Sequence, residues 1–176
     1  VNNKILISNH IRSKYGNLSE EDLNKKVLSF VKTKETNFYY HKENGDFWNV
    51  MIFIANSITH DIVVNKEIAY EGGKLLGAFL NATSDFESSQ LIDVIPNFHD
   101  MSFRYKEYES SMQIASKERL EKAINYKKIV SDLKTEMHIL QELKEAKVIP
   151  VRVTHNDTKI SNSLFDNDNK GICMID

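Results

Sequence analysis

Residues 151–176 read VRVTHNDTKISNSLFDNDNKGICMID, and this stretch decides the fold. VRVTH (151–155) predicts a short strand and NDTKISN (156–162) a polar loop, because an apolar, β-branched run is followed by turn-forming residues. SLFD (163–166) and GICMI (171–175) predict two further strands joined by a polar turn. The stretch therefore predicts a polar loop held between strands, which is a rigid place for a catalytic side chain.

The polar side chains of this stretch have the chemistry of phosphoryl transfer. Asp157 follows a strand and can accept a proton from a hydroxyl nucleophile. Asn162 offers a neutral amide oxygen and Asp176 a charged one, and hard oxygen ligands of this kind suit Mg²⁺ on a nucleotide. Lys159 can neutralise phosphate charge, and His155 completes the candidate catalytic group as a residue that braces the loop. One aspartate as base, with an asparagine and an aspartate as metal ligands, is the division of labour of phosphoryl transfer.

These residues also carry a family resemblance. THNDTKISNSLFD (154–166) followed by GICMID (171–176) resembles the catalytic loop and metal-binding segment of the aminoglycoside phosphotransferase and choline kinase superfamily, relatives of protein kinases whose loop runs H-x-D-x-x-x-x-N. HNDTK (155–159) is similar to the N-acetylhexosamine 1-kinase branch in particular. FWNVMIFIANS (47–57) resembles the last strand of the nucleotide lobe with its hinge, and IPNFHDMSFRY (95–105) resembles the same branch.

The resemblance implies an α+β, protein-kinase-like fold that binds ATP and Mg²⁺. Asp157 would then orient the substrate hydroxyl, and Asn162 and Asp176 would be the Mg²⁺ ligands. The backbone near Phe53 and Ile54 would contact the adenine. The implied substrate is a small sugar, an N-acetylhexosamine phosphorylated at its anomeric hydroxyl.

The chain lacks two parts of the family pattern, a glycine-rich phosphate loop and a strand lysine that would pair with the α/β-phosphates. Family members also continue beyond the metal-binding aspartate. We therefore expect a fragment in which residues 1–55 are the end of the nucleotide lobe and the hinge, and residues 56–176 are the first part of the helical lobe. The fragment alone is expected not to turn over ATP.

Upstream, the sequence predicts a helix in NLSEEDLNKKVLSFVKTK (17–34), with Ser19 and Asp22 forming a capping box and an apolar face running to Val31. Strands are expected at 38–41 and 47–54 on either side of Asn44-Gly45, a hairpin-turn dipeptide. The second strand is apolar enough to be buried on both faces.

Two more helices are expected. NKEIAYEGGKLLGAFLNA (65–82) has one apolar side, and its three glycines indicate a close helix crossing. A single long helix is predicted from about residue 116 to 146, ended by Pro150.

Composition narrows the function classes. Apolar residues make up 41% and charged residues 27%, and 23 basic residues nearly balance 25 acidic ones. This composition predicts a globular protein without nucleic acid or a membrane as its partner. The single cysteine, Cys173, is expected to be an inert core thiol and fits a reducing, cytoplasmic setting.

Alternative functions remain open on the sequence alone. A choline- or aminoglycoside-type kinase is the alternative within the enzyme class, and a non-catalytic, kinase-like binding domain is the alternative outside it. Sulfatase chemistry is excluded, because neither Pro96 nor Pro150 stands in a C/S-x-P-x-R string. The scattered histidines lack zinc-site spacing.

Overall fold

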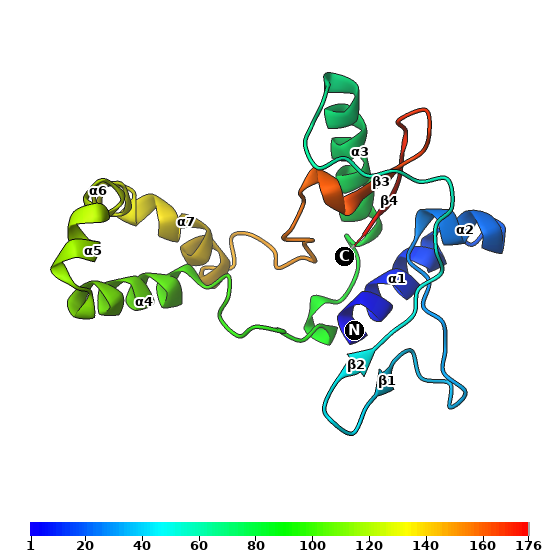
Figure 1. The fold of residues 1–176 in the computed structure, drawn as a ribbon, viewed down its shortest axis with the longest axis horizontal. Helices are drawn as coiled ribbons and strands as arrows, with labels where there is room; N and C mark the ends of the chain where they lie inside the picture. Colours follow the sequence, from blue (N-terminus) through cyan, green and yellow to red (C-terminus); the bar gives the residue numbers. More distant parts are fainter. Residues whose placement is uncertain (176) are drawn as a thin grey trace. The chain divides into compact units, whose positions relative to one another are not determined.

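A computed structural model describes residues 1–175, and the chain forms two compact units (Figure 1). Unit 1 comprises Val1–Gln90 together with the chain from Arg152 onward, and unit 2 comprises Leu91–Val151. Helices and short antiparallel strands make up the fold, which confirms the α+β prediction. The division into a nucleotide lobe and a helical lobe at residue 55 is a functional one, and it stays a prediction.

The described residues of unit 1 form three α-helices, two 3-10 helices and two small sheets. In chain order they are α1 (Asn2–Lys14), α2 (Glu20–Lys26), β1 (Tyr40–His41), β2 (Phe47–Trp48), α3 (Lys66–Ala82), η1 (Ser88–Gln90), η2 (Ile160–Asn162), β3 (Ser163–Phe165) and β4 (Gly171–Met174).

Helix α1 was not among the predicted elements, and polar contacts tie it to the rest of unit 1. His10 Nε2 lies 3.0 Å from an Asp85 carboxylate oxygen, and Lys14 pairs with the other oxygen of Asp85. Arg12 donates to the Ser29 hydroxyl at 2.6 Å. Asp85 follows α3 in the chain and Ser29 follows α2, so these contacts hold α1 to the segments after both helices.

The predicted cap of helix α2 is confirmed. The Ser19 hydroxyl accepts a hydrogen bond from the Asp22 N–H at 3.1 Å and donates to the Asp22 carboxylate at 2.7 Å. The helix then stops at Lys26, and Val27 is extended with φ −140° and ψ 135°. The start of the helix was predictable from the sequence, because an N-terminal cap depends only on neighbouring residues.

The predicted continuation of this helix to Val31 is wrong. The Val31 N–H donates to the Val50 carbonyl at 2.8 Å, and the Ile52 N–H donates to the Ser29 carbonyl at 2.9 Å. A bridge between Phe30 and Met51 lies between these two bonds. Strand pairing with a partner some twenty residues away therefore replaces the helix, and a helical pattern in one segment does not reveal such a partner.

The hairpin at Asn44-Gly45 is confirmed, with shorter strands than predicted. Gly45 adopts φ 93°, and its N–H donates to the Lys42 carbonyl at 2.9 Å. The Lys42 N–H in turn donates to the Asp46 carbonyl at 2.8 Å, the pattern of a tight turn followed by a left-handed glycine. β1 and β2 pair Tyr40 with Trp48.

The prediction that the second strand is buried on both faces is wrong. Side chains from Phe47 to Phe53 are mostly exposed, and Phe53 reaches 84% exposure. Only Ile54, at 6%, is buried. The apolar run here has no second layer of residues against it in the part of the chain that the structure describes.

Helix α3 and the β3–β4 hairpin form the centre of unit 1. Asn65 caps α3 by accepting the Ile68 N–H at 2.9 Å, as its place before the apolar run indicates. Ile68 and Phe165 are completely buried. Ile58 pairs with Phe165 through both backbone hydrogen bonds, so the order across this small sheet is the 58 segment, β3 and β4.

Gly72 is closely approached by a side chain of η2 rather than by a second α-helix, and Gly73 and Gly77 are not closely approached. A Cβ atom on Gly72 would lie 2.6 Å from the Ile160 Cδ1 atom, whereas the other two positions are open. The Gly73→Ala variant is expected to raise the free energy of unfolding by about 0.5–1 kcal/mol, because alanine is the better helix former. Gly72→Ala should raise the free energy of unfolding by less than this, because the Ile160 side chain must move to make room for the Cβ atom. Chemical denaturation of both variants measures the difference, and an equal or larger gain in Gly72→Ala would contradict the close approach.

The segment VRVTH is not a strand, contrary to prediction. Residues 151–155 have no ladder partner among the described residues, although Val153 is buried and Arg152 donates from its guanidinium to the Leu80 carbonyl at 3.2 Å. The buried Val153 side chain and side-chain bonds of Arg152 and His155 hold this segment instead. The predicted strands at 163–166 and 171–175 are confirmed as β3 and β4.

Unit 2 contains α4 (Met101–Ile114), α5 (Lys117–Lys122), α6 (Ile124–Asp132) and α7 (Lys134–Glu145). The single helix predicted for 116–146 is wrong. The chain bends at Ala123 and Leu133, whose φ and ψ are near −90° and 0°, so that three helices form in place of one. Helix α7 then runs alongside α4 (Figure 1). The Lys134 ammonium lies 4.5 Å from the Tyr105 ring centre, and the His138 ring contacts Tyr105 at 5.5 Å. Packing on α4 thus favours the bends.

Across residues 1–175, no helix is long and apolar enough to cross a membrane.

Candidate functional site

Thr154–Asn162 form the loop that the sequence singled out, and both of its ends are fixed. Val153 is buried just before it, and η2 carries it into β3. The chain bends at Asn156, whose φ of 61° is left-handed. This conformation is uncommon outside glycine, and asparagine is among the residues that tolerate it best.

Asp157, Lys159 and Asn162 lie together, as the sequence predicted. The Lys159 ammonium lies 2.9 Å from Asp157 Oδ2. The Asn162 amide nitrogen donates to the same oxygen at 3.0 Å and to the Asp157 backbone carbonyl at 2.9 Å. The loop is therefore closed on itself around one carboxylate oxygen.

The charge state of Asp157 follows from these contacts. The hydrogen bond from Lys159 is the largest cause of a lowered pKa of the Asp157 carboxyl. Desolvation opposes it, and the weaker effect of the Asn162 hydrogen bond lowers the pKa further. The side chain is 55% exposed, so an incoming molecule can reach it. An ionised, accessible carboxylate is suited to hold a hydroxyl group in place rather than to act as a strong base.

His155 braces the loop, as expected. Its Nε2 atom lies 3.2 Å from the Ile175 carbonyl, and its ring meets the edge of Phe79 at 5.6 Å. Its Nδ1 atom is buried and has no hydrogen-bond partner among residues 1–175. His155 faces the interior of unit 1 and Asp157 faces outward, so the two side chains have separate roles.

The same contacts connect the loop to the end of β4. The Ile175 N–H donates to the Asn162 carbonyl at 2.8 Å, and the Ile175 carbonyl oxygen lies within hydrogen-bond distance of His155 Nε2. Asp176, the second predicted metal ligand, lies outside the described residues. The residue before it is thus held by both the histidine and the asparagine of the motif.

Of the two predicted magnesium ligands, Asn162 lies within the described residues, and its side chain offers an oxygen that suits Mg²⁺. Asn162 is buried to 5% exposure, and its amide nitrogen makes the bonds to Asp157, which leaves the amide oxygen as the atom for a cation. Within residues 1–175, no three or more His, Cys, Asp or Glu side chains are grouped as a metal site. Mg²⁺ that is bound through one or two protein carboxylates and through substrate phosphates does not need such a group.

The two residues expected near adenine are in the same unit as the loop. Ile54 is buried and its carbonyl accepts the Ser57 hydroxyl at 2.7 Å, whereas the Phe53 side chain projects into solvent. The segment then pairs with β3 through Ile58. Among the described residues, no hydrogen bond or ring contact joins Phe53 or Ile54 to Asp157, so their role stays a prediction.

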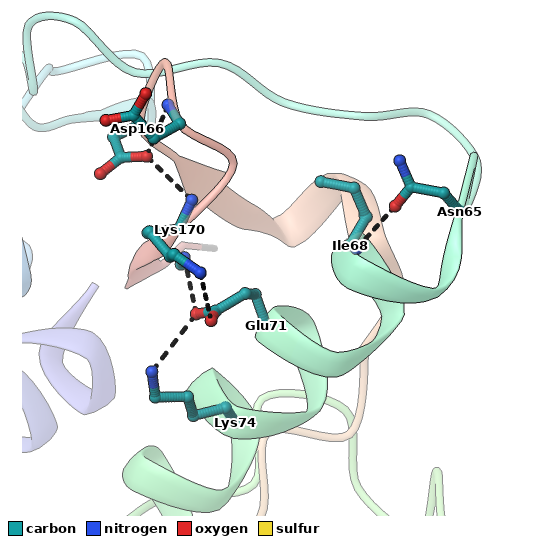
Figure 2. A network of polar contacts seen from close by, with 8 residues as sticks. Asn65, Ile68, Glu71, Lys74, Asp166 and Lys170 are labelled. Carbon is teal, nitrogen blue, oxygen red and sulfur yellow. Dashed lines mark hydrogen bonds and ion pairs between the residues drawn. The ribbon is translucent and has the colours of Figure 1, made fainter.

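Sequence reasoning missed Glu71, which clamps the start of β4 to helix α3 (Figure 2). Its side chain is 6% exposed and accepts the Gly171 N–H at 3.2 Å, with the Lys170 and Lys74 ammonium groups at 3.4 and 3.5 Å. The Gly171 bond is the largest cause of a lowered Glu71 pKa. A lone acid between Ile68 and Leu75, on the apolar side of a helix, was the signal available in the sequence.

Gly171 is the matching feature on the strand. A Cβ atom at this position would lie 2.6 Å from the Leu75 Cγ atom and 3.1 Å from the Glu71 carbonyl oxygen. Asp166 completes the turn by accepting the N–H groups of Asp168 and Lys170 at 2.9 and 2.8 Å. Figure 2 shows Lys170 between the Asp166 turn and the Glu71 carboxylate.

Cys173 is a core thiol, as predicted. It is almost completely buried on β4, and this burial raises the pKa of the thiol to about 12. At neutral pH it is therefore protonated and unreactive.

No protein-family model matches the chain.

Proposed function

We propose that the protein is an ATP- and Mg²⁺-dependent phosphotransferase of the aminoglycoside phosphotransferase and choline kinase type. Its acceptor in this proposal is a small hydroxylated metabolite, an N-acetylhexosamine at its anomeric hydroxyl. The observation that supports it best is the closed loop in which Lys159 and Asn162 both contact the carboxylate of Asp157. The resemblance of residues 154–166 to the family loop supports it independently of that geometry.

The proposed mechanism assigns one task to each residue. Asp157 accepts a hydrogen bond from the acceptor hydroxyl and orients its oxygen toward the γ-phosphoryl group. Lys159, which lies beside that carboxylate, would neutralise charge that builds on the phosphate oxygens. Asn162 and Asp176 would hold Mg²⁺, which supplies charge neutralisation between the phosphates. His155 keeps the loop and the end of β4 in register.

Positioning and electrostatics account for most of the rate in such a reaction, because the transferred group needs little covalent help. The backbone near Phe53 and Ile54 is the proposed adenine contact. A cytoplasmic setting belongs to the same proposal, because ATP and Mg²⁺ are supplied there.

A coupled assay of ATP consumption tests the proposal. The full-length protein is incubated with ATP, with or without Mg²⁺, and with N-acetylglucosamine, N-acetylgalactosamine, choline or an aminoglycoside as acceptor. We expect turnover that needs both Mg²⁺ and an N-acetylhexosamine, with a 1-phosphate as product. Turnover only with choline or an aminoglycoside would move the acceptor to those classes. The absence of turnover with every acceptor would favour the non-catalytic binding domain.

A further inference from the structure

Asn156, whose backbone is left-handed, lies between His155 and Asp157, whose side chains point in different directions. In a regular extended chain, residues two apart point to the same side. His155 and Asp157 are such a pair, yet His155 contacts Phe79 and Ile175 inside unit 1 while Asp157 is exposed. The left-handed conformation of Asn156, with φ 61°, is the backbone feature that separates them.

We propose that Asn156 is a positioning residue, whose left-handed backbone directs His155 to β4 and Asp157 to the Lys159–Asn162 pair. The kinetic part of this inference rests on the proposed phosphotransferase function, and the structural part does not. The Asn156 side chain supports the conformation, because its Oδ1 atom accepts the Thr154 hydroxyl at 2.6 Å.

Residue type decides whether such a conformation is stable. Glycine reaches φ near +60° without strain, asparagine tolerates it, and a β-branched residue is strongly disfavoured there. If the backbone conformation is what matters, glycine should replace Asn156 even though it cannot accept from Thr154. Valine should then release the loop, and alanine should lie between the two.

Asn169 provides a matched control. It is left-handed too, with φ 58°, and lies in the turn between β3 and β4, where its N–H donates to the Asp166 carbonyl at 3.0 Å. An Asn169→Val change imposes the same backbone strain in the same unit, away from Asp157. Backbone strain should therefore lower the stability of both valine variants, whereas the contacts around Asp157 should change only in Asn156→Val.

The first measurement is made by NMR on the side-chain NH₂ group of Asn162, whose nitrogen donates to Asp157. We expect Asn156→Val to shift these two proton signals toward the values of a solvent-exposed amide. Asn156→Gly and Asn169→Val should leave them in place. Unshifted signals in Asn156→Val would overturn the proposal, and so would an equal shift in Asn169→Val. Should Asn156→Val fail to fold, Asn156→Ala takes its place with a smaller shift expected.

The second measurement is kinetic, on the full-length protein. Asn156→Val is expected to lower kcat at least about tenfold with the KM for ATP within about twofold, because a small misplacement of a catalytic group is costly. Asn156→Gly should stay within about threefold of the original kcat. Loss of kcat in Asn156→Gly equal to that in Asn156→Val would overturn the backbone argument. Absence of turnover in the unchanged protein would instead reject the proposed function, and the NMR series would still decide the role of Asn156.

Discussion

Replacing Glu71 by alanine is expected to lower the melting temperature by roughly 5–10 °C. The change leaves the Gly171 N–H without its acceptor beneath the strand and removes the partner of Lys74 and Lys170. Glu71→Gln should recover most of the loss, because its amide oxygen still accepts from Gly171 and exposed lysine pairs contribute little. Thermal unfolding followed by circular dichroism measures both variants.

Glu67→Ala is the matched control for Glu71→Ala. It removes a largely exposed glutamate one turn earlier on α3, whose nearest partner is Lys66 at 3.9 Å. Its melting temperature should stay within about 2 °C of the original. A similar fall in both alanine variants would show that helix α3 responds to any lost acid, and would contradict the clamp.

The pH dependence of Glu71 has a definite sign. Its pKa is lowered in the folded protein, so its contribution to stability is complete above the unfolded value of about 4.3 and is lost as the pH falls through the folded value. The stability difference between the unchanged protein and Glu71→Gln should therefore be constant above about pH 5 and shrink in more acidic solution. A difference that grows on acidification would mean that the carboxyl is protonated in the fold.

Asp157→Asn is expected to reduce acceptor-dependent ATP turnover at least about 10²-fold, because misplacing the acceptor hydroxyl is costly. Asparagine has nearly the same shape and keeps an oxygen for the Asn162 amide, but it has no charge with which to orient a hydroxyl or pair with Lys159. The KM for ATP should change little, because Asp157 is proposed to contact the acceptor. The coupled assay on the full-length protein measures both constants.

Asp168→Asn serves as the control for Asp157→Asn. It removes a charge from the exposed turn between β3 and β4, in the same unit and without touching the loop. Turnover should stay within about twofold of the original. If Asp157→Asn keeps full turnover, Asp157 does not have the proposed role.

The candidate site was predictable because its contacts are local in the chain. The bonds from Asn162 to Asp157 and from His155 to Ile175 span at most twenty residues, and the two apolar runs after the loop are recognisable as strands, although the run before it is not one. Residue types in a loop of this kind therefore predict most of its geometry. Asn156 was the part that residue type alone did not reveal, because a left-handed asparagine looks like any polar loop residue.

Longer-range features were not predictable in the same way. The pairing of Val31 with Val50 replaced a helix, and packing on α4 bent a predicted long helix at Ala123 and Leu133. Glu71 and Gly171 are separated by 100 positions. Each of these depends on a partner distant in sequence, which local periodicity does not identify.

The composition of unit 1 from two separate stretches of chain has a consequence for biosynthesis. Residues 1–90 leave the ribosome well before β3 and β4, which supply Phe165 to the core and Gly171 to Glu71. Unit 2 is one continuous stretch and is complete earlier, so it can fold while the first segment still waits. During that interval helix α3 lacks β4, the strand that packs against it in the folded unit.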